Sequence, residues 1–154
     1  MSQCKNHQHC IDTAISNALL ACQEANVRLT PLREQLLKLI WKSHQPLGAY
    51  DLIEMLAEVS ERCIAPPTVY RTLNFLLNVG LIHRINSLNA FIGCTDPSTR
   101  HPSYFLICTE CQTATECHND SLRQQVSHIG TQTGFRIQQQ WLEVLGLCQN
   151  CQKL

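Results

Sequence analysis

Apolar residues recur every three or four positions through most of the first 80 residues, which is the spacing of helices with one buried face. These stripes cover residues 11–25, 32–40, 52–59 and 69–77. Thr30-Pro31 precedes the second stripe, and this pair is typical of an N-cap followed by the first helical residue. Gly80 follows the fourth stripe, where glycine is the preferred C-terminal cap. The pattern predicts four helices.

The apolar period changes to two directly after Gly80. Residues 81–85 and 90–92 alternate like the two strands of a β-hairpin, with Ser87-Leu88-Asn89 at its turn. Helices followed by such a hairpin form the outline of a winged helix-turn-helix.

The second half of the chain predicts a small α+β unit. Strands are expected at 103–108, 113–116 and 135–147, with a helix near 122–129. About fifty residues is marginal for an independent hydrophobic core, so a metal, a partner subunit or both should stabilise this unit. The expected fold class is therefore α+β, a winged helix-turn-helix followed by a small α+β unit. The predicted divisions are a flexible tail (1–10), a winged-helix DNA-binding domain (11–93), a hinge (94–102) and a small α+β domain (103–154), for which the resemblance given below implies a role in dimerisation and metal binding.

Composition excludes several other classes of protein. Apolar residues make up 44% of the 154 residues and charged residues only 16%, which argues against a disordered acidic or basic chain. There is no apolar run of the roughly 18 residues that span a membrane and no secretory signal, so we expect a cytoplasmic protein without a membrane partner. Up to Asn86 there are 8 basic and 7 acidic residues, then 4 and 5, so net charge alone does not predict a nucleic-acid partner.

Cysteine is the unusual residue, with 10 in the chain beside 7 histidines. Two CxxC pairs are separated by 36 residues, and each pair fits a tight turn that offers two thiolates. Four sulfurs favour a closed structural zinc site, formed by Cys108, Cys111, Cys148 and Cys151. Two disulfides or a thioredoxin-type redox pair are the alternatives. The lack of an export signal disfavours the first, and the lack of a helix opening at either motif disfavours the second.

A looser set of possible ligands comprises His83, Cys94, His101 and Glu116. One thiolate, two imidazoles and one carboxylate also suit zinc. A two-residue hairpin loop at Leu88-Asn89 would place His83 opposite Cys94, on one face and within ligand distance. The alternative is four unrelated polar residues around a loop. His118 is the substitute ligand if His101 is not one.

The helix that begins at Pro66 presents a candidate DNA-binding face. Its apolar positions point inward, which leaves Thr68, Tyr70, Arg71 and Asn74 on the outer face. Arginine suits bidentate contact with guanine, whereas threonine and tyrosine suit phosphates or thymine methyl groups. Further phosphate contacts would come from Arg28, Arg33 and Arg84. The alternative is an ordinary solvated helix face.

The first ten residues carry four further possible metal ligands, which are Cys4, His7, His9 and Cys10. They suggest an extra metal site. The favoured interpretation is a mobile tail with incidental ligands, because an unstructured segment loses conformational entropy when it binds. Cys22 lies on the first apolar stripe and is expected to be a core thiol.

Several separated motifs resemble the ferric uptake regulator family, and the resemblance covers about residues 11 to 151. The motifs are Arg28-Leu29-Thr30-Pro31-x-Arg33, Ala49-Tyr50-Asp51-Leu52 and Pro66-Pro67-Thr68-Val69-Tyr70-Arg71-Thr72-Leu73-x-Phe75-Leu76. The CxxC pairs fall where that family places its structural zinc. The zinc uptake regulator branch is the most similar, because its regulatory set matches His83, Cys94, His101 and Glu116. Iron-sensing members instead carry a histidine-rich stretch where this chain has His101 alone.

This resemblance implies a zinc-responsive, DNA-binding transcriptional repressor of zinc uptake genes. It implies two zinc ions per protomer, one structural and one regulatory, the latter bridging the two domains. It also implies a homodimer, formed through the C-terminal half, that binds an AT-rich palindromic operator in double-stranded DNA. Tyr70 and Arg71 match family positions that enter the major groove. The N-terminal cysteines and histidines lie outside the family pattern.

No enzymatic activity, catalytic residue or small-molecule substrate is expected. A catalytic zinc needs an open coordination position and a general base, and a set of four protein ligands leaves no such position. An iron-, peroxide- or redox-responsive regulator of the same family is the alternative function. In that case Cys94 or the CxxC pairs would act as thiol switches.

Overall fold

The computed structural model describes residues 7–61, 63–97 and 102–153. The chain forms two compact units, Met1–Arg100 and His101–Leu154. The boundary between them falls inside the 94–102 segment predicted as a hinge. Among the described helices, none combines the length and the apolar character needed to cross a membrane.

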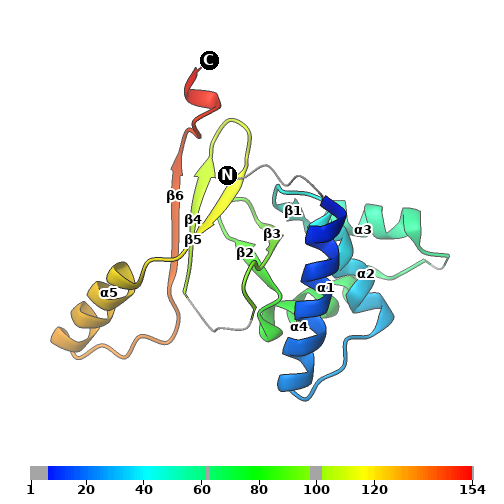
Figure 1. The fold of residues 1–154 in the computed structure, drawn as a ribbon, viewed down its shortest axis with the longest axis horizontal. Helices are drawn as coiled ribbons and strands as arrows, with labels where there is room; N and C mark the ends of the chain where they lie inside the picture. Colours follow the sequence, from blue (N-terminus) through cyan, green and yellow to red (C-terminus); the bar gives the residue numbers. More distant parts are fainter. Residues whose placement is uncertain (1–6, 62, 98–101, 154) are drawn as a thin grey trace. The chain divides into compact units, whose positions relative to one another are not determined.

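The first unit contains the four predicted helices (Figure 1), which are α1 (His7–Glu24), α2 (Pro31–Trp41), α3 (Ala49–Val59) and α4 (Pro66–Val79). Its core joins one face of each helix, and its largest fully buried members include Leu36, Leu37, Ile40, Leu52, Leu56, Leu73 and Leu76. Gly80 closes α4 with a φ of 80°, a left-handed conformation that glycine adopts without steric cost. The helical expectations for this unit are therefore confirmed.

Residues 7–10, which were predicted to belong to a flexible tail, form the first turn of α1, which begins at His7. The buried stripe of α1 comprises Ile11, Ala14, Ala18 and Cys22, and His7 lies one turn before Ile11 on the same stripe. The polar composition of residues 7–10 concealed this extra turn. Cys22 is buried in the core, as expected.

The hairpin forms the wing of the first unit, as predicted, but with a different register. Its strands are β2 (Ile82–Ile85) and β3 (Ala90–Gly93), and β3 also pairs with the short strand β1 (Leu47–Gly48). Ile85 pairs with Ala90, so the loop comprises four residues rather than the two predicted. Asn89 in this loop has a φ of 48°, which asparagine tolerates better than most residues. Two residues are too few for β1 to show a periodic pattern.

The second unit is a three-stranded sheet with one helix. Its elements are β4 (Ser103–Cys108), β5 (Ala114–Cys117), α5 (Asp120–Gln132), β6 (Trp141–Gly146) and the 3₁₀ turn η1 (Cys151–Lys153). The strand order is β5-β4-β6; β5 runs antiparallel to β4, whereas β6 runs parallel to it. Asn119 caps α5, since its Oδ1 accepts a hydrogen bond of 3.0 Å from the Leu122 N–H.

The predicted strand at 135–147 is wrong in its first half. Residues 135–140 lie outside β6, although Phe135 and Ile137 alternate with polar residues as a strand would. Gly130 is the only buried residue of α5, and a Cβ placed there would meet the Ile137 side chain at 2.9 Å. Ile137 therefore packs against the bare backbone of the helix instead of extending the sheet.

Candidate functional site

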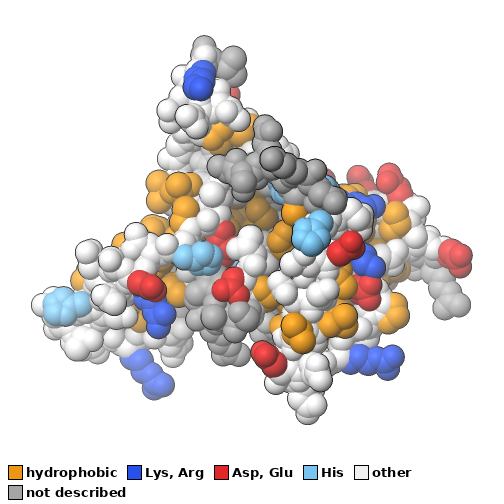
Figure 2. Space-filling model, in the orientation of Figure 1, with side chains coloured by type: hydrophobic (Ala, Val, Ile, Leu, Met, Phe, Trp, Pro, Cys, Tyr) orange, Lys and Arg blue, Asp and Glu red, His pale blue; other side chains and the backbone are white. Residues whose placement is uncertain are grey.

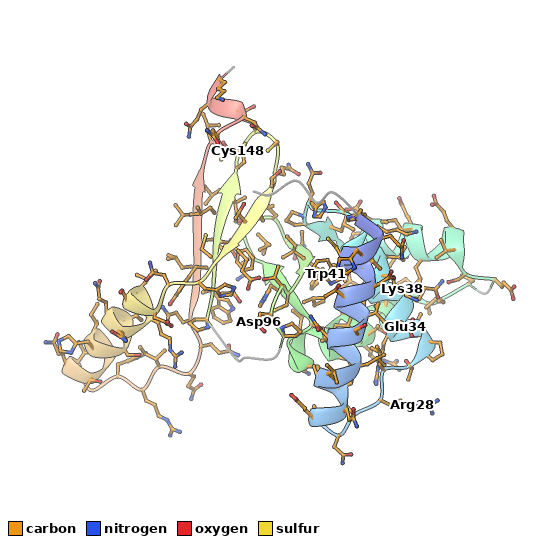
Figure 3. The ribbon with its side chains drawn as sticks, viewed as in Figure 1. Arg28, Glu34, Lys38, Trp41, Asp96 and Cys148 are labelled. Atoms are coloured by element: carbon orange, nitrogen blue, oxygen red, sulfur yellow. The ribbon has the colours of Figure 1, made fainter. Side chains whose placement is uncertain are left out.

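The parallel pairing of β4 and β6 brings the two CxxC motifs together. In parallel strands the carboxyl ends lie at the same edge of the sheet, and here Cys108 at the end of β4 pairs with Gly146 at the end of β6. Cys148 follows β6 by two residues, as Figure 3 shows at the end of that strand. The fold of the second unit thus places both motifs at one edge.

Each motif turns back so that its second cysteine approaches its first. In the first turn the Gln112 N–H donates to the Cys108 carbonyl at 2.9 Å, and Gln112 has a φ of 56°. In the second turn the Cys151 N–H donates to the Cys148 carbonyl at 3.0 Å. These turns aim two sulfurs from each motif at a common point.

The four sulfurs, from Cys108, Cys111, Cys148 and Cys151, all lie within 4.8 Å of one another. The Cys111 and Cys148 sulfurs are 3.8 Å apart. A tetrahedral zinc ion with Zn–S bonds of about 2.3 Å requires sulfurs about 3.8 Å apart. The four are thiols rather than disulfides in this structure. The residues present therefore fit a closed, four-thiolate zinc site.

Hydrogen bonding divides the thiols of this cluster by acidity. The pKa of Cys108 falls to about 6, because the backbone N–H groups of Cys111 and Cys148 donate to its sulfur. The pKa of Cys151 rises to about 12, because its thiol is hydrogen-bonded to the Cys148 sulfur and is partly desolvated. Before a metal binds, the cluster therefore combines a thiolate with retained protons that the metal must displace.

We expect zinc binding to this cluster to weaken on acidification, and to do so more steeply below about pH 6. Cys151 releases a proton at every accessible pH, whereas Cys108 releases one only below its pKa of about 6. Each displaced proton lowers the apparent affinity by about tenfold per pH unit. Competition titrations with a zinc chelator from about pH 8 to pH 5 measure this slope. A slope that stays constant through pH 6 would contradict the assignment of Cys108.

His83 and Cys94 come together on the wing, although not by the predicted pairing. His83 in β2 pairs with Ile92, and Cys94 lies just beyond β3, where its N–H donates to the Leu81 carbonyl at 3.0 Å. The ligand atoms of His83 and Cys94 are within 4.8 Å of each other. The predicted register was wrong by two residues, and because side chains alternate with a period of two, both residues stay on one face.

The other two residues of the mixed set belong to the second unit. Glu116 lies in β5, opposite Phe105, and is half-buried. His101 lies outside the described residues. The substitute His118 lies just beyond β5 and is exposed.

Trp41 supports the strand that leads to Cys94, which the sequence pattern did not predict. Trp41 ends α2, and its indole ring lies directly on Gly93 of β3, so that a Cβ added there would overlap the ring. Figure 3 labels Trp41 within the first unit. Only glycine allows this approach, so the Trp41–Gly93 contact fixes the backbone next to Cys94.

Gly93→Ala is therefore expected to destabilise the protein by about 1–3 kcal/mol, the usual effect of overpacking. It should also weaken the binding of zinc to any site that includes Cys94, because the neighbouring backbone must shift. Thermal unfolding and zinc titration measure the two effects. Gly146→Ala is the matched control, since a Cβ at Gly146 meets nothing within 4 Å. Equal stability of the two variants would show that the indole moves aside freely.

The outer face of α4 is exposed as predicted. Val69, Leu73 and Leu76 are buried, whereas Tyr70, Arg71 and Asn74 are exposed and Thr68 is half-buried. Pro66 and Pro67 lie in the first turn of α4, where their missing N–H groups leave no helical hydrogen bond unmade. This helix face is the candidate nucleic-acid interface.

The two arginines before and within α2 differ in their surroundings. Arg28 is exposed in the loop between α1 and α2, where Figure 3 labels it. Arg33 donates from Nη1 to the Arg28 carbonyl, and its guanidinium lies 3.4 Å from the centre of the Phe75 ring. Arg33 thus braces α2 against α4 through a cation–π contact, which no sequence signal indicated. Arg84 is exposed on β2 and donates to Asn89 Oδ1 at 2.9 Å.

Three of the four N-terminal candidates, His7, His9 and Cys10, lie in the first turn of α1. Cys4 lies outside the described residues. His9 is exposed, whereas His7 and Cys10 are half-buried.

A winged-helix unit, followed by a small sheet whose edge carries a four-thiolate cluster, defines a class of metal-binding transcription regulator. Residues 24–145 match the ferric uptake regulator family, and the chain belongs to this family. Its members are transcription regulators and not enzymes, in agreement with the sequence-based prediction.

The individual relatives point to one branch of the family. The zinc uptake regulation protein of Escherichia coli (strain K12) is 34% identical over 139 residues, which are 89% of this chain and 80% of that protein. The crystal structure of holo XcZur is 38% identical, with a TM-score of 0.85 over 94% of this chain and 99% of that one. A zinc uptake regulator complexed with zinc and DNA is 31% identical, with a TM-score of 0.87 over 93% and 95% of the two chains.

Proposed function

We propose that this protein is a zinc-responsive, DNA-binding repressor of zinc uptake genes that acts in the cytoplasm as a homodimer. One observation carries the proposal: the chain places an imidazole and a thiolate, His83 and Cys94, within 4.8 Å on the wing. The similarity to a zinc uptake regulator complexed with zinc and DNA supports it.

The protein binds two zinc ions per protomer in this proposal. Cys108, Cys111, Cys148 and Cys151 hold the structural ion, whose closed set of sulfurs leaves no open position. His83, Cys94, His101 and Glu116 hold the regulatory ion. A mixed set of nitrogen, sulfur and oxygen ligands favours zinc less strongly than four thiolates do. This weaker preference suits an ion that binds reversibly.

Zinc acts by reducing conformational freedom. The regulatory ligands come from both compact units, so an ion held by all of them restricts how the winged helices of a dimer are oriented. Recognition helices held one helical turn of DNA apart bind two half-sites at a lower entropic cost. Zinc thereby raises DNA affinity, and zinc-replete cells repress zinc import.

DNA is bound by the outer face of α4. Tyr70, Arg71 and Asn74 are exposed there and contact base edges in the major groove, with Thr68 at the N-terminal end of the helix. Arg28 contacts phosphate, and Arg33 positions that loop through the Arg28 carbonyl in addition to any phosphate contact of its own. The operator is an AT-rich palindrome, whose two-fold symmetry matches that of the dimer.

The second unit supplies the dimer interface. Its core is small, and many of its apolar side chains are exposed, including Leu106, Ile129, Phe135, Trp141, Val144, Leu145 and Leu147. Figure 2 shows apolar side chains at the surface over its sheet. The outer edge of β6 has no neighbouring strand in the described sheet. So much exposed apolar surface on about fifty residues is typical of an interface with a partner.

Leu145→Glu is expected to convert the dimer into a monomer, because the proposed interface would bury a charge without a partner in each protomer, which is strongly unfavourable. Leu145 is 57% exposed in a single chain, so the charge should not unfold the protomer. Sedimentation equilibrium measures the change. Leu20→Glu, at a residue 59% exposed on α1, is the matched control and should stay dimeric.

The test of the proposed function is DNA binding across buffered concentrations of free zinc, followed by fluorescence anisotropy of an AT-rich palindromic probe. Ferrous iron and manganese are run in parallel, and mild oxidant is added at constant free zinc. A steep increase in affinity with zinc alone supports the proposal. Binding that follows iron, or DNA release by oxidant at constant zinc, would instead support the iron-, peroxide- or redox-responsive alternatives.

A further inference from the structure

A histidine ends the buried stripe of α1 and contacts the end of α2. His7 lies one turn before the buried Ile11, and its Nε2 is 2.9 Å from the carbonyl oxygen of Lys42. Lys42 is the C-cap of α2, whose last carbonyls have no partner within the helix. Because a carbonyl only accepts, Nε2 must carry the proton.

This hydrogen bond leaves a lone pair on the other nitrogen of the ring. A neutral imidazole protonated at Nε2 is an acceptor at Nδ1. The His7 Nδ1 atom is buried and has no hydrogen-bond partner among the described residues. A buried acceptor without a partner is unfavourable, and a cation bound at Nδ1 would satisfy it.

A second imidazole lies beside the first. The rings of His7 and His44 have centroids 4.7 Å apart and planes inclined at 64°. His44 comes from the loop after α2 and is exposed, so solvent reaches this side of the pair. Figure 2 shows histidine side chains near the N-terminal end of α1. Cys10 follows His7 by three residues and therefore lies on the same side of the helix, but the ligand atoms of His7, His44 and Cys10 do not all lie within 4.8 Å of one another, so its sulfur would reach a shared ion only after a side-chain rotation.

We propose that His7 and His44 bind a third divalent ion of the zinc type, with water in its shell and with the Cys10 thiolate joining it after a side-chain rotation. Imidazole and thiolate are ligands that zinc prefers among divalent ions. Metal-bound histidines commonly donate their other N–H to a backbone carbonyl, as His7 does to Lys42. The ion would tie the start of α1 to the loop that leads from α2 towards α3.

This site differs from the N-terminal site suggested by sequence alone. His9 is exposed on another side of α1, and it is replaced here by His44, which is 37 positions away from His7. The described part of α1 supplies only two of the ligands. The site also stands apart from the structural and regulatory zinc ligands, so its existence does not depend on the proposed function.

Zinc stoichiometry in His44→Gln tests the proposal. This substitution removes a ligand and leaves the His7–Lys42 hydrogen bond intact, so a merely structural role of His7 is unaffected. The purified dimer is equilibrated at a series of buffered free zinc concentrations, and bound zinc is measured by elemental analysis. Wild type is expected to bind one more equivalent per protomer than His44→Gln. The matched control is His9→Gln, which should bind as much as wild type.

Cobalt supplies an independent readout of the thiolate. Protein already loaded at its tighter sites is titrated with Co²⁺, and wild type should gain a sulfur-to-cobalt charge-transfer band that Cys10→Ser lacks. Equal zinc content of wild type and His44→Gln at every free zinc concentration would overturn the proposal. If the regulatory site is misassigned, wild type and His44→Gln each contain one equivalent of zinc less than proposed. The difference of one equivalent between the two proteins then remains.

Discussion

Cys94→Ser is expected to abolish the zinc dependence of DNA binding and to leave the fold intact. Cys94 supplies the only thiolate of the proposed regulatory set and is 4% exposed, so serine fits its place but binds zinc far less well. Coupling between two ligands is typically about 5- to 150-fold in affinity. We expect the increase in DNA affinity with zinc to fall from this range to under about threefold. Fluorescence anisotropy across buffered free zinc measures it.

The matched control is Cys63→Ser, which changes an exposed cysteine of the same unit. It should respond to zinc as wild type does. The Cys94 variant should also retain its structural zinc and a wild-type circular dichroism spectrum. Global unfolding, or an undiminished response to zinc, would show that Cys94 is not a regulatory ligand.

Cys108→Ser has the opposite expected effect, a loss of structure rather than of response. The second unit has few buried side chains, and a structural zinc ion contributes directly to the folding of such small domains. Losing one of four thiolates should release the ion. We expect the midpoint of thermal unfolding to fall by ~10 °C or more, with dissociation of the dimer. Calorimetry, zinc analysis and size-exclusion chromatography follow the three changes.

Cys117→Ser is the control for this second prediction, because Cys117 lies in β5 of the same unit but outside the thiolate cluster. It should keep its zinc and its dimer. A Cys108→Ser protein that remains a stable, zinc-free dimer would contradict the structural role of the cluster.

These two predictions separate the functions of the two sites by their chemistry. The sulfur-only cluster lies at one edge of a sheet, and backbone N–H groups already lower the pKa of Cys108 to about 6. Such a site is preorganised to bind zinc strongly. The proposed regulatory set has one sulfur and includes residues of both compact units, so part of the free energy of binding in this proposal must order the chain. Weaker, order-dependent binding is what a sensor requires.

The sequence by itself determined those features that depend on neighbours in the chain. The helices of the first unit follow from apolar spacing, the start of α2 from Thr30-Pro31 and the end of α4 from Gly80. Local propensity and amphipathic spacing act within a few turns of helix, so one sequence carries them in full. The two CxxC motifs could be recognised for the same reason.

Tertiary structure alone decided the features that depend on contacts between distant residues. It set the four-residue hairpin loop, packed Ile137 on Gly130 in place of a longer strand, and placed the Arg33 guanidinium on Phe75. It also paired β4 with β6 in parallel, which brings the CxxC motifs to one edge. Strand register and close packing are fixed by many weak contacts between segments far apart in the chain, and no local pattern encodes those contacts.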